Sequence, residues 1–369
     1  MVTNASTLVN FGATTQSVGD WMYSQYAMPS PGYLPLNSYT ASYLVSSYTA
    51  LGALIVPVLT PVTYAATART LPSSSQWRDV AYGNGIFVAV STTTSTAAAS
   101  SPDGITWTAR TLPVAANWVA VAFGNGVFVA TTTTTSTVAA TSTDGITWTQ
   151  RTLPSGDWAS VAFGNGLFVA VSSSSSSAAT SPDGITWTTR TLSTSANWAK
   201  VVYGNGVFVA IATSAATATT VSSDGITWTT GAMPSAQNWS GMAYGNGVFV
   251  ANSGASSTVA ATSTDGLTWT ARTLPATAAW TRIAYGNNSF FIVSQSTAAA
   301  TSPDGITWTS RTMSASATWL GLTFGGGKFV AVASASTAAA TIDYAVNATS
   351  FVLPVVAPKA GTTAYVKAT

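Results

Sequence analysis

The 369-residue sequence contains no cysteine and no histidine, and its ten acidic residues are all aspartate. The chain therefore cannot form disulfides, thiolate nucleophiles, the usual zinc sites or histidine-based acid–base pairs. A glycosidase needs two neighbouring carboxyl groups, but outside the repeats described below only Asp20, Asp79, Asp157 and Asp343 are acidic. We therefore expect no enzyme and assign no catalytic, cofactor-binding or metal-binding residue.

Charge is scarce as well. Charged residues make up 6% of the chain, against about 25% in an average soluble protein. The net charge of +2 is small and the basic residues are scattered, so no cluster that would follow nucleic-acid phosphates is expected. The longest apolar stretch, 51–62, is interrupted by two prolines, so no membrane span is expected. The N-terminus shows no secretory signal peptide.

A tryptophan recurs at spacings of 39 to 41 residues, and each copy is followed five residues later by Tyr or Phe and a Gly-containing tight turn. A repeat of this length buries its apolar face only against neighbouring copies. The regular spacing favours packing between repeats over a row of sugar-stacking platforms. The anchors are Trp77, Trp118, Trp158, Trp198, Trp239, Trp280 and Trp319.

Each repeat reads as four short strands. In the first unit these are residues 77–82, 86–90, 97–101 and 105–111, separated by turn signals or a Ser/Thr loop. Four antiparallel strands in about 40 residues are typical of a propeller blade, and propellers have about four to eight blades. We therefore predict an all-β fold, a seven-bladed β-propeller of four-stranded antiparallel blades. A right-handed β-solenoid is the alternative, but its coils are usually shorter.

The seventh unit lacks a recognisable fourth strand, and two segments could supply it. Residues 64–72 copy the end of the fourth strand of other units, and the C-terminal run 346–354 is the alternative. We favour 64–72, because an N-terminal strand would close the ring and remove an open edge. The predicted organisation is an N-terminal attachment segment (1–62), a propeller (63–354) and a C-terminal tail (355–369).

Six units contain the sequence Asp-Gly-(Ile/Leu)-Thr-Trp. The segment Ser101-Pro-Asp-Gly-Ile-Thr-Trp107 and its copies resemble the Asp-box of sialidase-type and related propellers, although they lack the residue between Asp and Gly. In that family the box is structural and lies away from the active site, so the resemblance implies the fold and no activity. The residues concerned are Asp103, Asp144, Asp183, Asp224, Asp265, Asp304, Trp107, Trp148, Trp187, Trp228, Trp269 and Trp308.

If the strands alternate in direction, the Ser/Thr-rich loops at 91–96, 131–137 and 172–177 lie on one face of the ring. We expect a ligand to be bound at this face, unless the loops only keep the surface polar. An arginine precedes Thr-(Leu/Met) at six places and is expected on a solvated rim, because a repeated residue is spread around a ring. These are Arg69, Arg110, Arg151, Arg190, Arg272 and Arg311.

The N-terminal residues do not join the repeat. Val18-Gly-Asp-Trp21, Pro31-Gly-Tyr-Leu-Pro-Leu-Asn37 and the run 46–54 resemble the tail-collar segment of bacteriophage tail fibres, although Ser38 replaces the glycine that follows Asn. The resemblance implies attachment and oligomerisation; an ordinary cap packed on the ring is the alternative. The attachment residues are Trp21, Tyr33, Leu34, Tyr48, Leu51 and Leu54.

Together these features predict a non-enzymatic bacteriophage virion structural protein that displays its propeller for surface adhesion. It would be a tail fibre, a head fibre or a capsid decoration protein, made in the host cytoplasm and located on the particle surface. Expected partners are other virion proteins through residues 1–62, further copies of the chain and a host-surface glycan. The alternative is a bacterial glycan-binding propeller lectin, which predicts repeated equivalent pockets.

Overall fold

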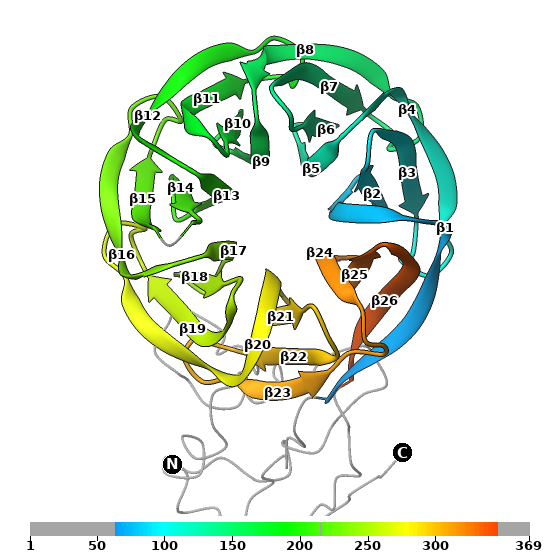
Figure 1. Ribbon diagram of the computed structural model, residues 1–369. Coiled ribbons are helices and arrows are strands. Elements are labelled where there is room, and N and C mark those ends of the chain that lie inside the picture. The colour runs from blue at the N-terminus through cyan, green and yellow to red at the C-terminus, as the bar shows by residue number, and fades with distance from the viewer. Residues whose placement is uncertain (1–62, 215, 346–369) are drawn as a thin grey trace, which may run out of the picture. The chain divides into compact units, whose positions relative to one another are not determined.

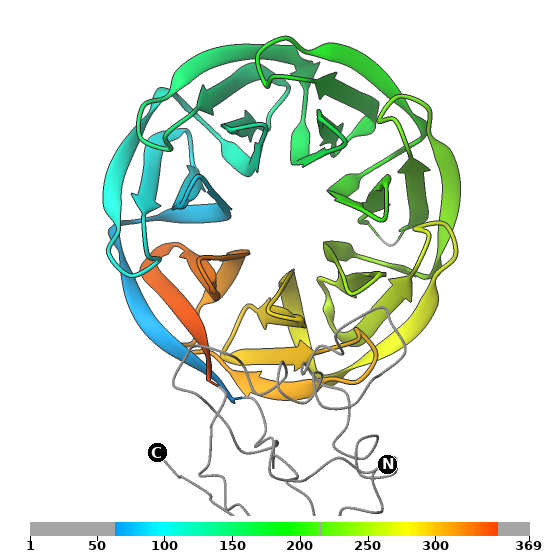
Figure 2. The same cartoon turned by 180° about the vertical axis from the view of Figure 1, so that it is seen from behind.

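The computed structural model describes residues 63–214 and 216–345, and residues 63–345 form one compact unit. The described residues form 26 strands and no helix. The strands are grouped in antiparallel sheets arranged radially about an axis (Figure 1), and the same arrangement is seen from behind (Figure 2). The predicted all-β propeller with four-stranded antiparallel blades is confirmed.

Three blades are separate four-stranded sheets. The first strand of each lies nearest the ring axis (Figure 1). The first of these sheets comprises β5 (Trp118–Gly124), β6 (Val127–Thr132), β7 (Ser136–Ser142) and β8 (Thr149–Gly156). The next two comprise β9 (Trp158–Gly164), β10 (Leu167–Ser172), β11 (Ser175–Ser181) and β12 (Thr188–Ala196), and then β13 (Trp198–Gly204), β14 (Val207–Ala212), β15 (Ala216–Ser222) and β16 (Thr229–Gln237).

Two seven-stranded sheets complete the ring, and in each the fourth strand in spatial order is unusually long. One is formed by β24 (Thr318–Gly325), β25 (Lys328–Ser334), β26 (Ser336–Ala345), β1 (Thr63–Gly83), β2 (Ile86–Thr92), β3 (Ser95–Ser101) and β4 (Thr108–Ala116). The other is formed by β17 (Trp239–Gly245), β18 (Val248–Ser253), β19 (Ser256–Ser263), β20 (Thr270–Gly286), β21 (Ser289–Ser294), β22 (Ala298–Ser302) and β23 (Thr309–Thr312).

Strand β1 divides its pairing between two neighbours. Residues 63–70 pair with β26, from Thr63↔Ala345 onwards, whereas residues 76–83 pair with β2. The run 346–354, the alternative closing segment, lies outside the described residues, as do residues 1–62 and 355–369.

The anchor tryptophans are buried between neighbouring repeats. Trp118 packs in one cluster with Val88 and Val90 of β2, in the preceding sheet, and with Phe128 of its own sheet. All seven anchors are completely buried. Each fully buried indole removes about 150–250 Å² from water, so these residues supply a large part of the apolar surface buried between repeats.

One predicted strand boundary is wrong. The fourth strand of the first unit was expected at residues 105–111, but β4 begins at Thr108. The reason is local, because the Oδ1 atom of Asp103 accepts the backbone N–H groups of Ile105 and Thr106 at 2.8 and 2.9 Å. Side-chain acceptors of this kind compete with the strand ladder for backbone donors.

Candidate functional site

The aspartates of the Asp-Gly-x-Thr-Trp segments build turns. In each, the Ser two residues before the Asp donates its hydroxyl proton to the carboxylate, as Ser222 does to Asp224 at 2.9 Å. The carboxylate also accepts the backbone N–H groups of Ile226 and Thr227, each at 2.8 Å. The Thr227 N–H, followed by that of Ile226, lowers the pKa of Asp224 to about 2. These carboxylates are therefore engaged within their own turns and do not converge on one site.

The tryptophan that ends each turn packs back onto it. The indole Nε1 of Trp187 donates to the carbonyl oxygen of Gly184 at 3.0 Å, and Trp107, Trp228, Trp269 and Trp308 bond in the same way. Trp187 and Trp308 are partly exposed, whereas the other turn tryptophans are buried.

The repeated arginines bind the neighbouring strand. Arg110 of β4 donates through Nε to the hydroxyl of Ser100 in β3 at 2.8 Å, and Arg190 makes the equivalent bond to Thr180 at 3.0 Å. The guanidinium of Arg311 also lies 5.3 Å from the centre of the Tyr64 ring. These six arginines are spread around the ring, and Gly231 takes the equivalent place in β16.

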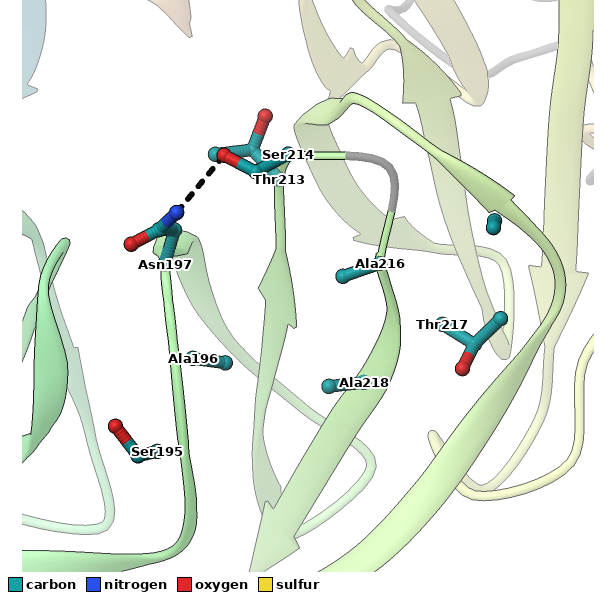
Figure 3. Close-up of a pocket in the computed structure, with 9 residues that line it drawn as sticks. Ser195, Ala196, Asn197, Thr213, Ser214, Ala216, Thr217 and Ala218 are labelled. Carbon is teal, nitrogen blue, oxygen red and sulfur yellow. Dashed lines mark hydrogen bonds between the residues drawn. The ribbon is translucent and has the colours of Figure 1, made fainter.

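The face of the ring that carries the Ser/Thr-rich loops is called the loop face below. It has hollows lined by small polar and methyl-bearing side chains. One, of about 460 Å³ and open to solvent, is bordered by the β12–β13 link at Asn197 and the β14–β15 loop at Thr213 and Ser214 (Figure 3). The Asn197 amide donates to the Ser214 hydroxyl at 2.8 Å. A second, of about 400 Å³, lies at the equivalent place beside Asn117 and residues 133–138.

Three threonines that line the second hollow, and Thr93 beside them, are held in a strained backbone conformation. Thr93, Thr94, Thr134 and Thr135 have φ values of 90°, 42°, 72° and 47°, a region that β-branched residues rarely adopt. Strain of this kind costs on the order of 1–3 kcal/mol for each residue and clusters at functional sites. The loop face is therefore a candidate binding surface.

The residue before two of the anchor tryptophans holds the loop of the preceding blade. Asn117 accepts the backbone N–H groups of Thr93 and Thr94 through its Oδ1 atom, at 3.1 and 2.7 Å. Asp157 accepts the N–H of Thr135 in the same way. That N–H is the main cause of the lowered pKa of Asp157. These side chains thus position the loops at the hollows.

A second group of polar residues lies on the strands nearest the axis. Arg78 and Asp79 of β1, Lys200 of β13 and Arg282 of β20 sit one or two residues after an anchor tryptophan, and we call them the axial charge cluster. A β-bulge falls at each of these places, between Trp and the second residue after it. Bulges re-aim side chains out of the regular alternation of a strand.

The members of this cluster interact although they are distant along the ring. Lys200 interacts electrostatically with Asp79, Arg282 and Arg78. Strands β5 and β9 separate β13 from β1 around the ring (Figure 1), so the interaction of Lys200 with Asp79 crosses the axis. The expectation that the basic residues are scattered is therefore corrected.

The sequence contained a signal for this cluster. Aligning the repeats on their tryptophans places Asp79, Lys200 and Arg282 at the same position, two residues after the anchor. The corresponding residues in the other units are Ala120, Ser160, Gly241 and Gly321.

Other kinds of site are not seen in the described part of the chain. Residues 63–214 and 216–345 contain no group of three His, Cys, Asp or Glu side chains that could hold a metal ion. The same residues include no helix of the length and apolarity needed to cross a bilayer. The predicted attachment residues Trp21, Tyr33, Leu34, Tyr48, Leu51 and Leu54 lie outside the described residues.

Sequence comparison agrees with the fold. The profile of a family described as a DUF6242 beta propeller domain matches residues 240–352, which is less than half of the chain. No curated protein matches the sequence.

Solved structures share the fold at low identity. Virginiamycin B lyase from Staphylococcus aureus is 12% identical with a TM-score of 0.68, over 76% of this chain and 99% of the lyase. YCF48 from Cyanidioschyzon merolae is 16% identical with a TM-score of 0.59, over 76% of this chain and 98% of that one. The WD40 propeller domain of Doa1 is 13% identical with a TM-score of 0.60, over 77% and 97% of the two chains.

These structures correct one expectation. We predicted that the protein is not an enzyme, yet the solved structures that share its fold include an enzyme, virginiamycin B lyase. An identity of 12% shows the fold alone, so the lyase activity is a property of that protein. The comparisons therefore show that this chain contains a β-propeller.

Proposed function

We propose that the protein is a bacteriophage virion structural protein, a tail fibre, head fibre or capsid decoration protein, that presents its propeller for surface adhesion. The observation that carries the proposal is the loop face, where strained threonines and their Asn and Asp partners form open hydroxyl-lined hollows. The likeness of residues 1–62 to a phage tail-collar segment supports attachment to the particle through that end. The Asp-Gly-x-Thr-Trp turns support kinship with Asp-box propellers.

Labelling of purified particles tests this role. Antibodies against the full chain, used with electron microscopy on particles from the lysate of cells that carry the gene, are expected to label tails or capsids. A shortened chain that begins at residue 63 is expected to be absent from the particles. Purified particles that lack the full-length protein would contradict the proposal.

We further propose that the ring has seven blades and is closed by its N-terminal strand. The glycine that ends each inner strand contacts an aromatic ring of the next unit, and the series returns to its start. The pairs are Gly83–Phe123, Gly124–Phe163, Gly164–Tyr203, Gly204–Tyr244, Gly245–Tyr285, Gly286–Phe324 and Gly325–Tyr82.

The role of residues 64–72 as the closing strand is supported by the rim arginines. Arg69 of β1 donates through Nε to Thr341 of β26 at 3.0 Å, which repeats the bond from Arg110 in β4 to Ser100 in β3. Residues 63–70 thus pair with β26 in the same way as the fourth strand of a blade pairs with its third strand. An electron-microscopy map along the axis tests the proposed count, and a map with any other number of blades would refute it.

A glycan-binding lectin is the second candidate, because the two hollows lie at equivalent places in different blades. It predicts that the propeller binds a sugar in solution whether or not the protein is part of a virion. A glycan array probed with the full chain, with Asn117→Ala as the matched variant, separates the two roles. Sugar binding without incorporation into particles would favour the lectin.

A further inference from the structure

The axial charge cluster contains three basic side chains and one carboxylate. Asp79 is buried, and its Oδ2 atom accepts the backbone N–H of Val121 in β5 at 3.1 Å. Among the described residues, only one salt bridge is found, between Lys328 and Asp343. Arg78, Lys200 and Arg282 are therefore without a salt-bridge partner in residues 63–345.

The basic groups are also poorly supplied with hydrogen-bond acceptors. Arg282 donates through Nη1 to the carbonyl oxygens of Thr281 at 3.0 Å and Ser240 at 3.5 Å. Its Nε atom is buried and has no partner among the described residues. A buried donor without an acceptor is unfavourable, and more so when it is charged, so an acceptor bound at this place would stabilise Arg282.

The surroundings disfavour these charges. Burial is the largest cause of the lowered pKa of Lys200 and of Arg78. Burial, followed by the neighbouring charge of Arg78, lowers the pKa of Arg282 to about 10. The three basic side chains are half-buried and share one carboxylate, Asp79, so their charge is only partly compensated, which is unfavourable. The equivalent positions of the other inner strands carry Ala, Ser or Gly and add no carboxylate.

We propose that the axial charge cluster binds an oxyanion with several acceptor oxygens, a phosphate or sulfate group, near the axis of the ring. The two guanidinium groups and the ammonium group belong to β1, β13 and β20, which reach the axis at separate places around the ring (Figure 1), and Lys200 interacts electrostatically with both arginines. Guanidinium groups bind oxyanions through paired N–H donors. A tetrahedral group offers acceptors in several directions, whereas a carboxylate offers two oxygens in one plane.

This inference is independent of the virion role. It concerns a site at the axis, whereas the proposed adhesion uses the loop face. A protein that binds phosphate but is absent from particles would refute only the proposed function.

Calorimetric titration of the full chain in a low-chloride buffer tests the proposal. Inorganic phosphate and sulfate are the probes, with acetate as the comparison, and phosphorylated and sulfated monosaccharides show whether the group is bound free or on a sugar. We expect phosphate or sulfate to bind at least about tenfold more tightly than acetate. No binding of either anion at about 10 mM would overturn the proposal.

Variants that remove a positive charge from the cluster, and one that removes its negative charge, separate a binding role from a structural one. Arg282→Gln and Lys200→Met are each expected to weaken phosphate or sulfate binding by about tenfold or more. Arg190→Gln, on the rim, is the matched control and should change it by less than about twofold. Asp79→Asn keeps an acceptor for the Val121 N–H and removes the negative charge, so it should tighten binding severalfold.

Simple destabilisation would not tighten binding, so the Asp79→Asn result distinguishes the proposal from a structural role. If Arg282→Gln fails to fold, Lys200→Met still provides the test, because the Lys200 ammonium makes no hydrogen bond within residues 63–345. Unchanged affinity in Lys200→Met together with unchanged or weaker affinity in Asp79→Asn would refute the site.

Discussion

Gly325, the last residue of β24, lies directly against the ring of Tyr82 in β1. A Cβ atom at Gly325 would lie 2.1 Å from the Cγ atom of Tyr82, so only hydrogen fits between the Gly325 backbone and the Tyr82 ring. The inner strands β24 and β1 contact each other there, as consecutive inner strands do elsewhere in the ring. The contact joins residues near the two ends of the described chain.

Replacing Gly325 by alanine should therefore loosen the ring. The methyl group would displace the Tyr82 ring, and we expect a loss of about 1–3 kcal/mol in the free energy of unfolding, as for other overpacked sites. Urea unfolding followed by tryptophan fluorescence measures the loss. Gly327→Ala is the control, because nothing lies within 4 Å of a Cβ there and its φ of 79° adds only backbone strain, about 1–2 kcal/mol. A smaller effect at Gly325 than at Gly327 would contradict this prediction.

The anchor tryptophans should contribute more stability than the turn tryptophans. Trp198 is completely buried, so Trp198→Ala should cost about 3–5 kcal/mol. Trp187 is partly exposed, and Trp187→Ala should cost clearly less, although the bond to Gly184 is lost. Chemical denaturation of the two variants in parallel provides the comparison. Equal losses would show that burial between sheets does not set the difference.

Acid should weaken the fold through the aspartate turns. The pKa of Asp224 is about 2 in the folded protein and 3.8 ordinarily, so its charged form stabilises the fold above pH 3.8. This contribution is lost as the pH falls through about 2. The pKa of each of the other five turn aspartates is lowered too. We expect the melting temperature to fall steeply in this interval.

Calorimetry between pH 5 and pH 2 measures the effect. Asp224→Asn should reduce the pH dependence, whereas Asp343→Asn, which alters an exposed ion pair with Lys328, should leave it nearly unchanged. A melting temperature that does not change with pH over this interval would argue against the turns as the acid-sensitive elements.

Asn117 should control the order of the loop before it. Asn117→Ala removes the acceptor of the Thr93 and Thr94 N–H groups, and these strained residues should relax. Hydrogen exchange at the two amides is expected to rise by about tenfold or more, which corresponds to roughly 1.4 kcal/mol. Asn197→Ala is the matched change in the blade of Figure 3 and removes a single side-chain bond to Ser214. Protection of Thr93 and Thr94 that survives in Asn117→Ala would refute this role.

The repeat predicts the architecture because its anchor tryptophans are large and evenly spaced. The tryptophan period and two turn signals in each unit are sufficient to predict four-stranded blades. The start of β4 at Thr108 is not predictable from residue preferences, because Ile105 favours a strand and only the carboxylate of Asp103 diverts its N–H. Local competition of this kind appears only once the turn is folded.

The axial charge cluster escaped prediction for a different reason. Arg78, Lys200 and Arg282 lie far apart in the sequence, and the ring brings them together. Their shared place after an anchor tryptophan was visible in the sequence, but a bulge at that place was not. The strained loop threonines were likewise unpredicted, because a threonine has no intrinsic preference for positive φ.

The pairing of β1 with β26 has a mechanical consequence. Tension that enters at residue 63 and runs along β1 would load the pairs from Thr63↔Ala345 to Thr70↔Ala338 together, so they would have to slide past one another at once. Tension between residues 63 and 345, which are paired neighbours, would instead open the ladder one pair at a time. Strand β1 pulled along its axis from residue 63 should therefore resist forces that separate the same two strands when residues 63 and 345 are pulled apart.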